Sequence, residues 1–233
     1  MSDLKQTNLE RELKALKKDI IQMMDLVANQ MERAEKAFID QDIALAKEVH
    51  HVEKRVDAAD LSIDKECENL IALYNPVASD LRLILASTKI ISHLERVGDH
   101  ADKIARYVRK KQVKRAYPKD LLKQVKLAEM FDLALEMLEI ATQAFIEEDS
   151  GLAREVFAKD ISMNEIYGSA ISRMHEYASQ KDPKVDLLLY LFSVINKLER
   201  VGDLAKNIAE ETIFYLEARI LKHRKVKNLK KLL

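Results

Sequence analysis

Acidic residues recur at intervals of three and four along two segments of this 233-residue chain, so that on helices each series would share one side. Like charges at this spacing repel one another by about 0.2 to 0.5 kcal/mol per pair. A hard cation that prefers oxygen ligands would turn that repulsion into coordination, which indicates a metal site. The two series are Glu53, Asp57, Asp60 and Asp64, and Glu95, Asp99 and Asp102.

Apolar residues on the same two segments determine where these acids would lie. At about 100° per residue, the acids fall roughly 80 to 140° from the centre of each apolar stripe, on one shoulder of the helix. If neighbouring antiparallel helices turn these shoulders towards their shared groove, up to seven carboxylates gather on one surface. The alternative is an ordinary solvated face, whose acids pair with Arg82, Arg96 or Arg106. Spacing alone leaves both interpretations open.

The chain contains an internal repeat that includes one acidic series. The string Leu-Glu-Arg-Val-Gly-Asp at Leu94 to Asp99 occurs again at Leu198 to Asp203, 104 residues later. Ala37 to Ile39 likewise returns as Ala144 to Ile146, 107 residues later. Two copies of one structural unit are therefore predicted. The duplication favours the metal interpretation, because a solvated face does not require identical acids in both copies.

The second copy keeps only part of the acidic pattern. Lys206 stands at the position of Asp102, and Asn164 stands at the position of Asp57. We therefore expect the second site to bind metal more weakly or with fewer ions. Its candidate oxygen ligands are Asp160, Glu199, Asp203 and Asn207.

Each copy of the repeated string places a glycine, Gly98 or Gly202, inside a predicted helix. A glycine in a helix interior costs about 1 kcal/mol relative to alanine. The backbone is therefore needed there without a side chain. Close packing of helices explains this at least as well as the approach of a ligand.

Apolar residues recur at spacings of three and four almost throughout, and the chain has only 4 Gly, 3 Pro and no Trp. This is typical of long helices, which short turns would make antiparallel, and Asp42 is expected to cap the second of them. The predicted fold is all-α. It has two tandem antiparallel three-helix bundles, residues 1–115 and 116–233, with a basic C-terminal tail from Lys222 to Lys231. The six predicted helices cover residues 4–39, 43–74, 77–111, 119–147, 152–180 and 185–222.

Charge and composition narrow the classes of function. The 39 basic and 39 acidic residues balance, whereas a nucleic-acid binder usually carries a basic excess. The single cysteine, Cys67, cannot form an intrachain disulfide, which suits a reducing compartment. No apolar run approaches the roughly 18 to 20 residues of a membrane span, and the charged N-terminus has no signal-peptide core. These features predict a soluble cytoplasmic protein.

Two other functions fit parts of the pattern. A ferritin-like di-iron enzyme needs paired Glu-x-x-His units facing a bundle core, and only Glu48 with His51 shows that spacing. Because the sequence also has no glycine-rich phosphate loop and no Ser/His/Asp grouping, no enzymatic activity is expected. A helical oligomerisation module would keep the bundles and use the acids only for solubility.

The whole chain closely resembles the PhoU family of bacterial phosphate-uptake regulators. The residues that carry the resemblance are Asn75-Pro76, Ser79 to Arg82, Leu94 to Asp99, Ala101 to Ala105, and Leu198 to Asp203 with Asn207, Ile208 and Glu210. The family is described as two three-helix bundles with a Glu/Asp-x-x-x-Asp motif, through which some members bind multinuclear iron or other metal clusters. That motif falls on Glu95 with Asp99, Glu199 with Asp203, and Glu53 with Asp57.

The resemblance implies negative regulation of the phosphate-starvation response and modulation of phosphate uptake. Such a protein would be an adaptor between the ATPase subunit of the Pst phosphate ABC transporter and the sensor histidine kinase PhoR. It would act as a homodimer in the cytoplasm, would meet the membrane only through its partners, and would not bind nucleic acid. The expected metal ions are divalent or trivalent: iron, zinc, manganese or magnesium.

Overall fold

Every regular element in a computed structural model of this chain, which describes residues 2–111, 117–180 and 184–221, is an α-helix. Side chains are described from Thr7 onwards in the first of these ranges. The predicted all-α fold is confirmed. The helices are α1 (Ser2–Asp40), α2 (Ile43–Tyr74), α3 (Ala78–Arg109), α4 (Lys119–Gln124), α5 (Leu127–Glu147), α6 (Ser150–Ala178) and α7 (Val185–Glu217).

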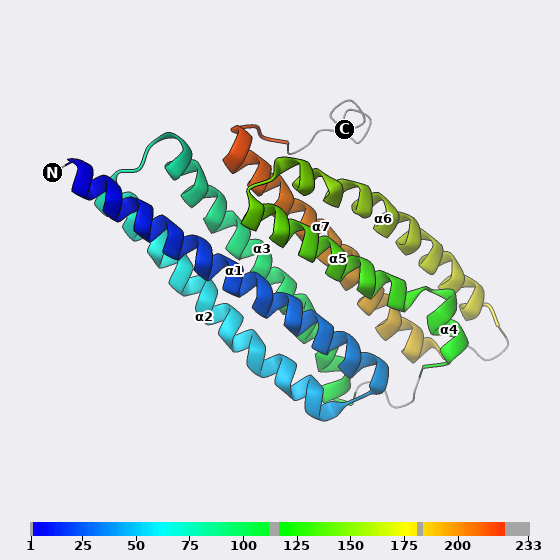
Figure 1. Ribbon diagram of the computed structural model, residues 1–233. Helices are drawn as coiled ribbons and strands as arrows, with labels where there is room; N and C mark the ends of the chain where they lie inside the picture. Colours follow the sequence, from blue (N-terminus) through cyan, green and yellow to red (C-terminus); the bar gives the residue numbers. More distant parts are fainter. Residues whose placement is uncertain (1, 112–116, 181–183, 222–233) are drawn as a thin grey trace.

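The helices form two three-helix bundles that lie side by side (Figure 1). The first consists of α1, α2 and α3, and the second of α5, α6 and α7. Because α3 also packs against α7, the order α2, α3, α7, α6 makes one layer. The helices α1 and α5 contact each other and cover this layer.

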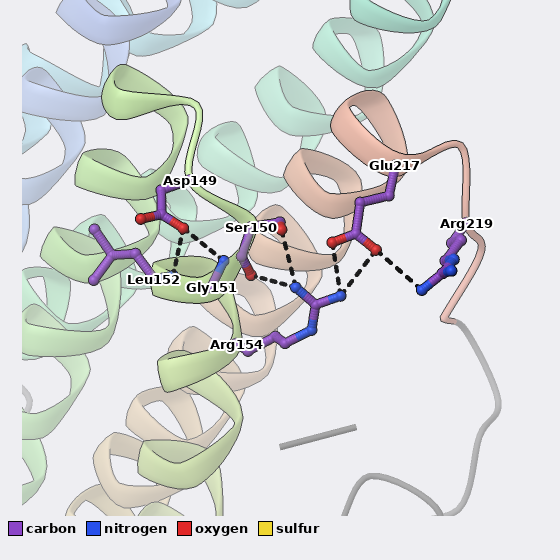
Figure 2. Close-up of polar contacts among 7 residues, drawn as sticks. All are labelled: Asp149, Ser150, Gly151, Leu152, Arg154, Glu217 and Arg219. Carbon is purple, nitrogen blue, oxygen red and sulfur yellow. Dashed lines mark hydrogen bonds and ion pairs between the residues drawn. The ribbon is translucent and has the colours of Figure 1, made fainter. Parts of the chain in front are cut away.

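The first turn of each bundle is built in the same way. Gln41 and Glu148 adopt left-handed backbone conformations with φ of 55°, and each is followed by an aspartate that caps the next helix. The carboxylate of Asp42 accepts hydrogen bonds from two backbone amides at the start of α2, which confirms the predicted cap. Asp149 does the same for α6, where it accepts from Gly151 (2.7 Å) and Leu152 (3.1 Å) (Figure 2). The repeat therefore extends to the capping chemistry.

The prediction of one continuous helix over residues 119–147 was wrong. The chain breaks after α4, where Lys126 adopts a left-handed conformation with φ of 55° before α5 begins. Val125 and Leu127 explain the break, because both are buried, at 0% and 1% exposure. On a continuous helix two such neighbours would point roughly 200° apart and could not both face the core. The break gives the described chain seven helices instead of six.

The last helix is also shorter than predicted. It ends at Glu217, and Ala218 follows in a left-handed conformation instead of continuing to residue 222. The carboxylate of Glu217 accepts two hydrogen bonds from the guanidinium group of Arg154 at the start of α6, at 2.8 and 2.9 Å (Figure 2). Arg219 approaches the same carboxylate at 3.6 Å. Polar contacts thus fasten this end of α7 to α6.

The helices α3 and α7 run antiparallel across the junction between the bundles. Near one end, Lys89 donates to Glu211 at 3.0 Å; eighteen residues further along α3, Tyr107 hydrogen-bonds to Ser193 at 2.6 Å. Gly98 and Gly202 lie midway between these two contacts on their respective helices. The two copies of the repeated string therefore lie at the same level of the molecule, on adjacent helices.

Two predictions concern residues outside the described ranges. The boundary between bundles, at residues 115 and 116, lies in the segment 112–116, and the basic tail from Lys222 to Lys231 follows the last described residue, Leu221. Both stay predictions. In the described part of the chain, no helix is both long enough and apolar enough to cross a membrane.

Candidate carboxylate site

The acids of α2 and α3 are directed towards one another. Burial raises the pKa of Glu53 to about 7; a hydrogen bond from Gln30 opposes this rise, and the charges of Asp57, Asp99 and Asp102 add to it. Two of those acids belong to α3, so carboxylates from both helices act on the same group. We call this set the first acidic patch; its members are Glu53, Asp57, Asp60, Glu95, Asp99 and Asp102.

The outer part of the first acidic patch shows the same convergence. Burial is the main cause of the raised pKa of Glu95, and the charges of Asp99, Asp60 and Asp57 contribute further. The pKa of Asp60 is raised by burial and then by the charges of Asp64 and Asp57. The shoulders therefore face their shared side and not opposite directions.

A polar pair lies at the base of this patch. Gln30, on α1, is fully buried, and its Nε2 donates to Glu53 Oε2 at 2.5 Å. The Oε1 atom of Gln30 is buried and has no hydrogen-bond partner among the described residues. A Cβ atom at position 98 would lie 2.9 Å from both Gln30 Oε1 and Glu53 Oε2. Gly98 is therefore needed to make room for these two side chains, which is a packing requirement.

Basic groups already occupy part of the first acidic patch. Lys103 forms an ion pair with Asp99 one turn away on α3. Asp102 accepts from Arg109 at 2.8 Å and lies 3.2 Å from His50 Nδ1. Of the predicted basic partners, Arg82 instead donates to the backbone oxygen of Tyr215.

In the second bundle a lysine joins the corresponding acids. The Nζ atom of Lys206 lies 2.9 Å from Asp160 Oδ2, on α6, and 2.8 Å from Asp203 Oδ1, on α7. Glu199 lies next to them: its pKa is raised by burial and then by the charge of Asp203, with a smaller contribution from Asp160. We call Asp160, Glu199 and Asp203 the second acidic patch.

At two further positions the second bundle has neutral side chains where the first bundle has acids. Asn164 is exposed on α6, and Tyr167, at the position of Asp60, donates to Asn196 at 3.0 Å. The fourth predicted ligand, Asn207, is half-buried one turn beyond Asp203 on α7. The second acidic patch thus has half as many carboxylates as the first.

Gly202 has different neighbours from Gly98. A Cβ atom at position 202 would meet Met137 Sδ and Met163 Cγ, both at 3.3 Å. These methionines are the repeat counterparts of Gln30 and Val56. The second bundle therefore packs two thioether side chains where the first holds a polar pair.

The donor set of the first acidic patch suits a hard cation. It offers several carboxylates and the buried amide oxygen of Gln30, which has no other hydrogen-bond partner among the described residues. However, nowhere in the described ranges are three or more His, Cys, Asp or Glu side chains already grouped to hold a metal ion. Asp99 and Asp102 would have to turn away from Lys103 and Arg109 to join such a group. Metal binding by the predicted ligands in either bundle stays a prediction.

The geometry does not form a ferritin-like site. Glu48 and His51 are both exposed, and Glu48 pairs with Arg33 on the surface at 2.9 Å. A di-iron centre of that class requires ligands that project into a bundle core. His100, by contrast, is half-buried on α3: partial burial lowers its pKa to about 4, with the charges of Lys103, Lys197 and Arg200 contributing.

Sequence reasoning missed three groups that contact the first acidic patch, namely Gln30, His50 and Arg109. Gln30 left a signal, because it is a lone amide in the apolar stripe of α1, between Val27 and Met31. Its partner could not be inferred, since the stripe of α1 faces both α2 and α3.

Comparison with known proteins gives consistent matches. The family model of the PhoU domain matches twice, over residues 20–108 and 127–212. The chain is 32% identical to the phosphate-specific transport system accessory protein PhoU homolog of Aquifex aeolicus, over 94% of this chain and 97% of that protein. It is 31% identical to the PhoU protein of Escherichia coli strain K12, which carries the same accessory-protein description, over 91% of this chain and 86% of that protein.

Solved structures with the same architecture agree with these matches. The crystal structure of PhoU from Pseudomonas aeruginosa superimposes with a TM-score of 0.84 at 30% identity, covering 90% of this chain and 99% of that one. The phosphate transport system regulatory protein PhoU from Streptococcus pneumoniae gives a TM-score of 0.82 at 23% identity, covering 92% and 99%. The second match supports the fold alone.

Proposed function

This chain belongs to the PhoU family, and from that premise we propose that it is an accessory protein of a phosphate-specific transport system that represses the phosphate-starvation response. The observation that carries the proposal is the match to an accessory protein of phosphate-specific transport over nearly the full length of both chains. Both copies of the family domain are present, so the match is not limited to one half.

The proposed action is that of an adaptor and not of an enzyme. One surface would meet the ATPase subunit of the Pst phosphate ABC transporter and another the sensor kinase PhoR, on the cytoplasmic side of the membrane and as a homodimer. Rigid helices packed across both bundles suit this role, because they hold two surfaces in a fixed relation. In plentiful phosphate the adaptor would keep the kinase in its non-signalling state.

We also propose that the first acidic patch holds a hard cation. Glu95 with Asp99 and Glu53 with Asp57 would supply carboxylate oxygens, and Gln30 Oε1 would supply a neutral one. The ion, whether iron, manganese, zinc or magnesium, would neutralise acids on α2 and α3 and so fix these helices against each other. No substrate is converted.

A phosphate-regulated reporter tests the regulatory role. Deletion of the gene is expected to make reporter expression constitutive in high phosphate, and the wild-type gene restores repression. Normal repression in the deletion strain would overturn the proposal.

Affinity capture tests the adaptor and metal parts separately. Wild-type protein captured in high phosphate is expected to bring the transporter ATPase and the kinase, and elemental analysis of the same preparation is expected to show bound metal. The Glu95→Ala/Asp99→Ala variant is expected to lose the metal. Retained partners without any metal in the wild type would leave an adaptor with no metal site.

A further inference from the structure

We infer that the ammonium group of Lys206 takes the place of a bound cation in the second bundle, so that the second acidic patch is neutralised without metal. The inference rests on the proposed function in one respect, because it assigns any bound metal to the first bundle. It is carried by the contacts of Lys206 and by comparison of the two repeats.

Lys206 makes the contacts that a bridging cation would make. Its Nζ lies within 2.9 Å of carboxylate oxygens from two different helices, Asp160 on α6 and Asp203 on α7. The Asp160 residue is only 8% exposed, so its charge needs a close counterion. Burial acts against the charged form of Lys206, but the hydrogen bonds to Asp203 and Asp160 outweigh it and leave the pKa of this lysine raised. The group is therefore an ammonium ion at neutral pH.

The first bundle has no equivalent cation at the matching position. Asp102 stands there instead of a lysine and is held by Arg109 and His50. Glu53, the counterpart of Asp160, hydrogen-bonds to the neutral amide of Gln30, and no ion pair reaches it among the described side chains. The buried acid at this repeat position therefore has no ion-pair partner among the described side chains in the first bundle, where it is Glu53. In the second bundle, where it is Asp160, Lys206 is that partner.

The other substitutions of the second bundle act in the same direction. Asn164 removes the charge that Asp57 contributes, and the Tyr167 to Asn196 hydrogen bond replaces the charge of Asp60 with neutral groups. Three carboxylates and the ammonium of Lys206 remain, against six carboxylates in the first acidic patch, of which Asp99 and Asp102 are paired with Lys103 and Arg109. The second patch therefore has less excess negative charge than the first to attract an external ion.

Thermal unfolding of full-length variants tests the inference, with manganese chloride or EDTA as the only difference between samples. The background is Glu95→Gln/Asp99→Asn, which removes two of the four carboxylates proposed as ligands in the first bundle. With Lys206 present, manganese is expected to leave the Tm of this background unchanged. Lys206→Met is expected to lower the Tm by about 3 to 8 °C, because two partly buried carboxylates lose their counterion. Lys206→Asp is expected to lower it as well, and manganese is expected to restore most of the loss.

Two results would overturn the inference. One is a manganese-dependent rise in Tm in the background with Lys206 intact that Asp203→Asn abolishes, which would show that the second patch binds metal despite the lysine. The other is a Lys206→Met variant that is as stable as its background, or a Lys206→Asp variant that does not respond to manganese. The effect of manganese on the Tm of the wild-type protein is a separate measurement. If manganese does not raise that Tm, the proposed metal site of the first bundle is contradicted, but the Lys206 comparison remains valid.

Discussion

Glu53 is a carboxylic acid held almost out of water, 8% exposed, with the neutral amide of Gln30 as its hydrogen-bond partner. Its burial, and then the neighbouring acids, raise its pKa from 4.5 to about 7. Between these two values the folded protein keeps a proton that the unfolded chain has lost. The free energy of unfolding should therefore fall as the pH rises through this window.

Replacement of this acid by its neutral isostere should remove that pH dependence. Glu53→Gln keeps an acceptor for Gln30 and adds an amide donor, so it is expected to be more stable than wild type by about 1 to 3 kcal/mol above pH 7, with the difference lost near pH 4.5. Urea unfolding in EDTA at several pH values measures it. Glu68→Gln, at an exposed position on the same helix, serves as the matched control. Parallel wild-type and Glu53→Gln profiles would contradict the assignment.

The two repeat glycines should respond differently to the same substitution. Alanine gains about 1 kcal/mol over glycine in a helix, and at position 202 only flexible methionine atoms at 3.3 Å must adjust. At position 98 the new Cβ meets two buried polar atoms at 2.9 Å. Gly98→Ala is therefore expected to be less stable than Gly202→Ala by about 1 to 2 kcal/mol. Chemical denaturation of both variants measures this, and equal effects would contradict the packing argument.

At this scale the sequence predicts which side of a helix carries the acids, but not what they contact. The 100° step per residue places Glu95 and Asp99 on one shoulder, as the structure shows. It cannot show that Gln30 reaches Glu53 from another helix 23 residues away. Nor can it show that identical strings around Gly98 and Gly202 have a polar pair above one and methionines above the other, because those neighbours come from distant segments.

At the scale of single elements, the chain breaks between α4 and α5 because burying two apolar side chains stabilises the fold more than a continuous helix would. Val125 and Leu127 are both buried, which requires Lys126 to adopt a left-handed conformation that costs an L-residue roughly 1 to 2 kcal/mol. Glycine adopts it at little cost. The long helices were predictable because their apolar period persists for many turns, whereas this break depends on two residues whose spacing departs from that period.

A substitution at Lys126 distinguishes a broken helix from a continuous one by the sign of its effect on the free energy of unfolding. Lys126→Gly is expected to stabilise the protein by about 1 kcal/mol, since it relieves the left-handed residue. In a continuous helix the same change would destabilise by a similar amount. Lys126→Ala controls for the loss of the exposed ion pair with Glu129. The midpoint of urea unfolding is the measurement.

At the scale of the whole molecule, contacts between α3 and α7 make the two bundles one packed unit. Lys89, on α3, pairs with Glu211, whose side chain is 3% exposed. The Nζ atom of Lys89 also lies 5.1 Å from the centre of the Phe214 ring. A charge pair with one buried member couples the two bundles. Sequence repeats predict two similar halves, but they contain no information on which faces of those halves meet.

The pair should contribute to the stability of both bundles together. Lys89→Met is expected to lower the free energy of unfolding by about 1 to 2 kcal/mol, and Glu211→Gln should recover part of this loss in the double variant. Because the bundles share this interface, the whole urea transition is expected to shift as one step. A transition that splits into two would show that the halves unfold independently.

The matched strings on α3 and α7 give one polypeptide the geometry of a symmetric pair without its constraint. In an assembly of two identical subunits, a mutation that places a lysine beside the acids appears at both sites at once. Here each half mutates on its own. One half can therefore carry its own counterion at Lys206 while the other keeps Asp102. The two repeats of one chain can thus acquire different binding properties, which two identical subunits cannot.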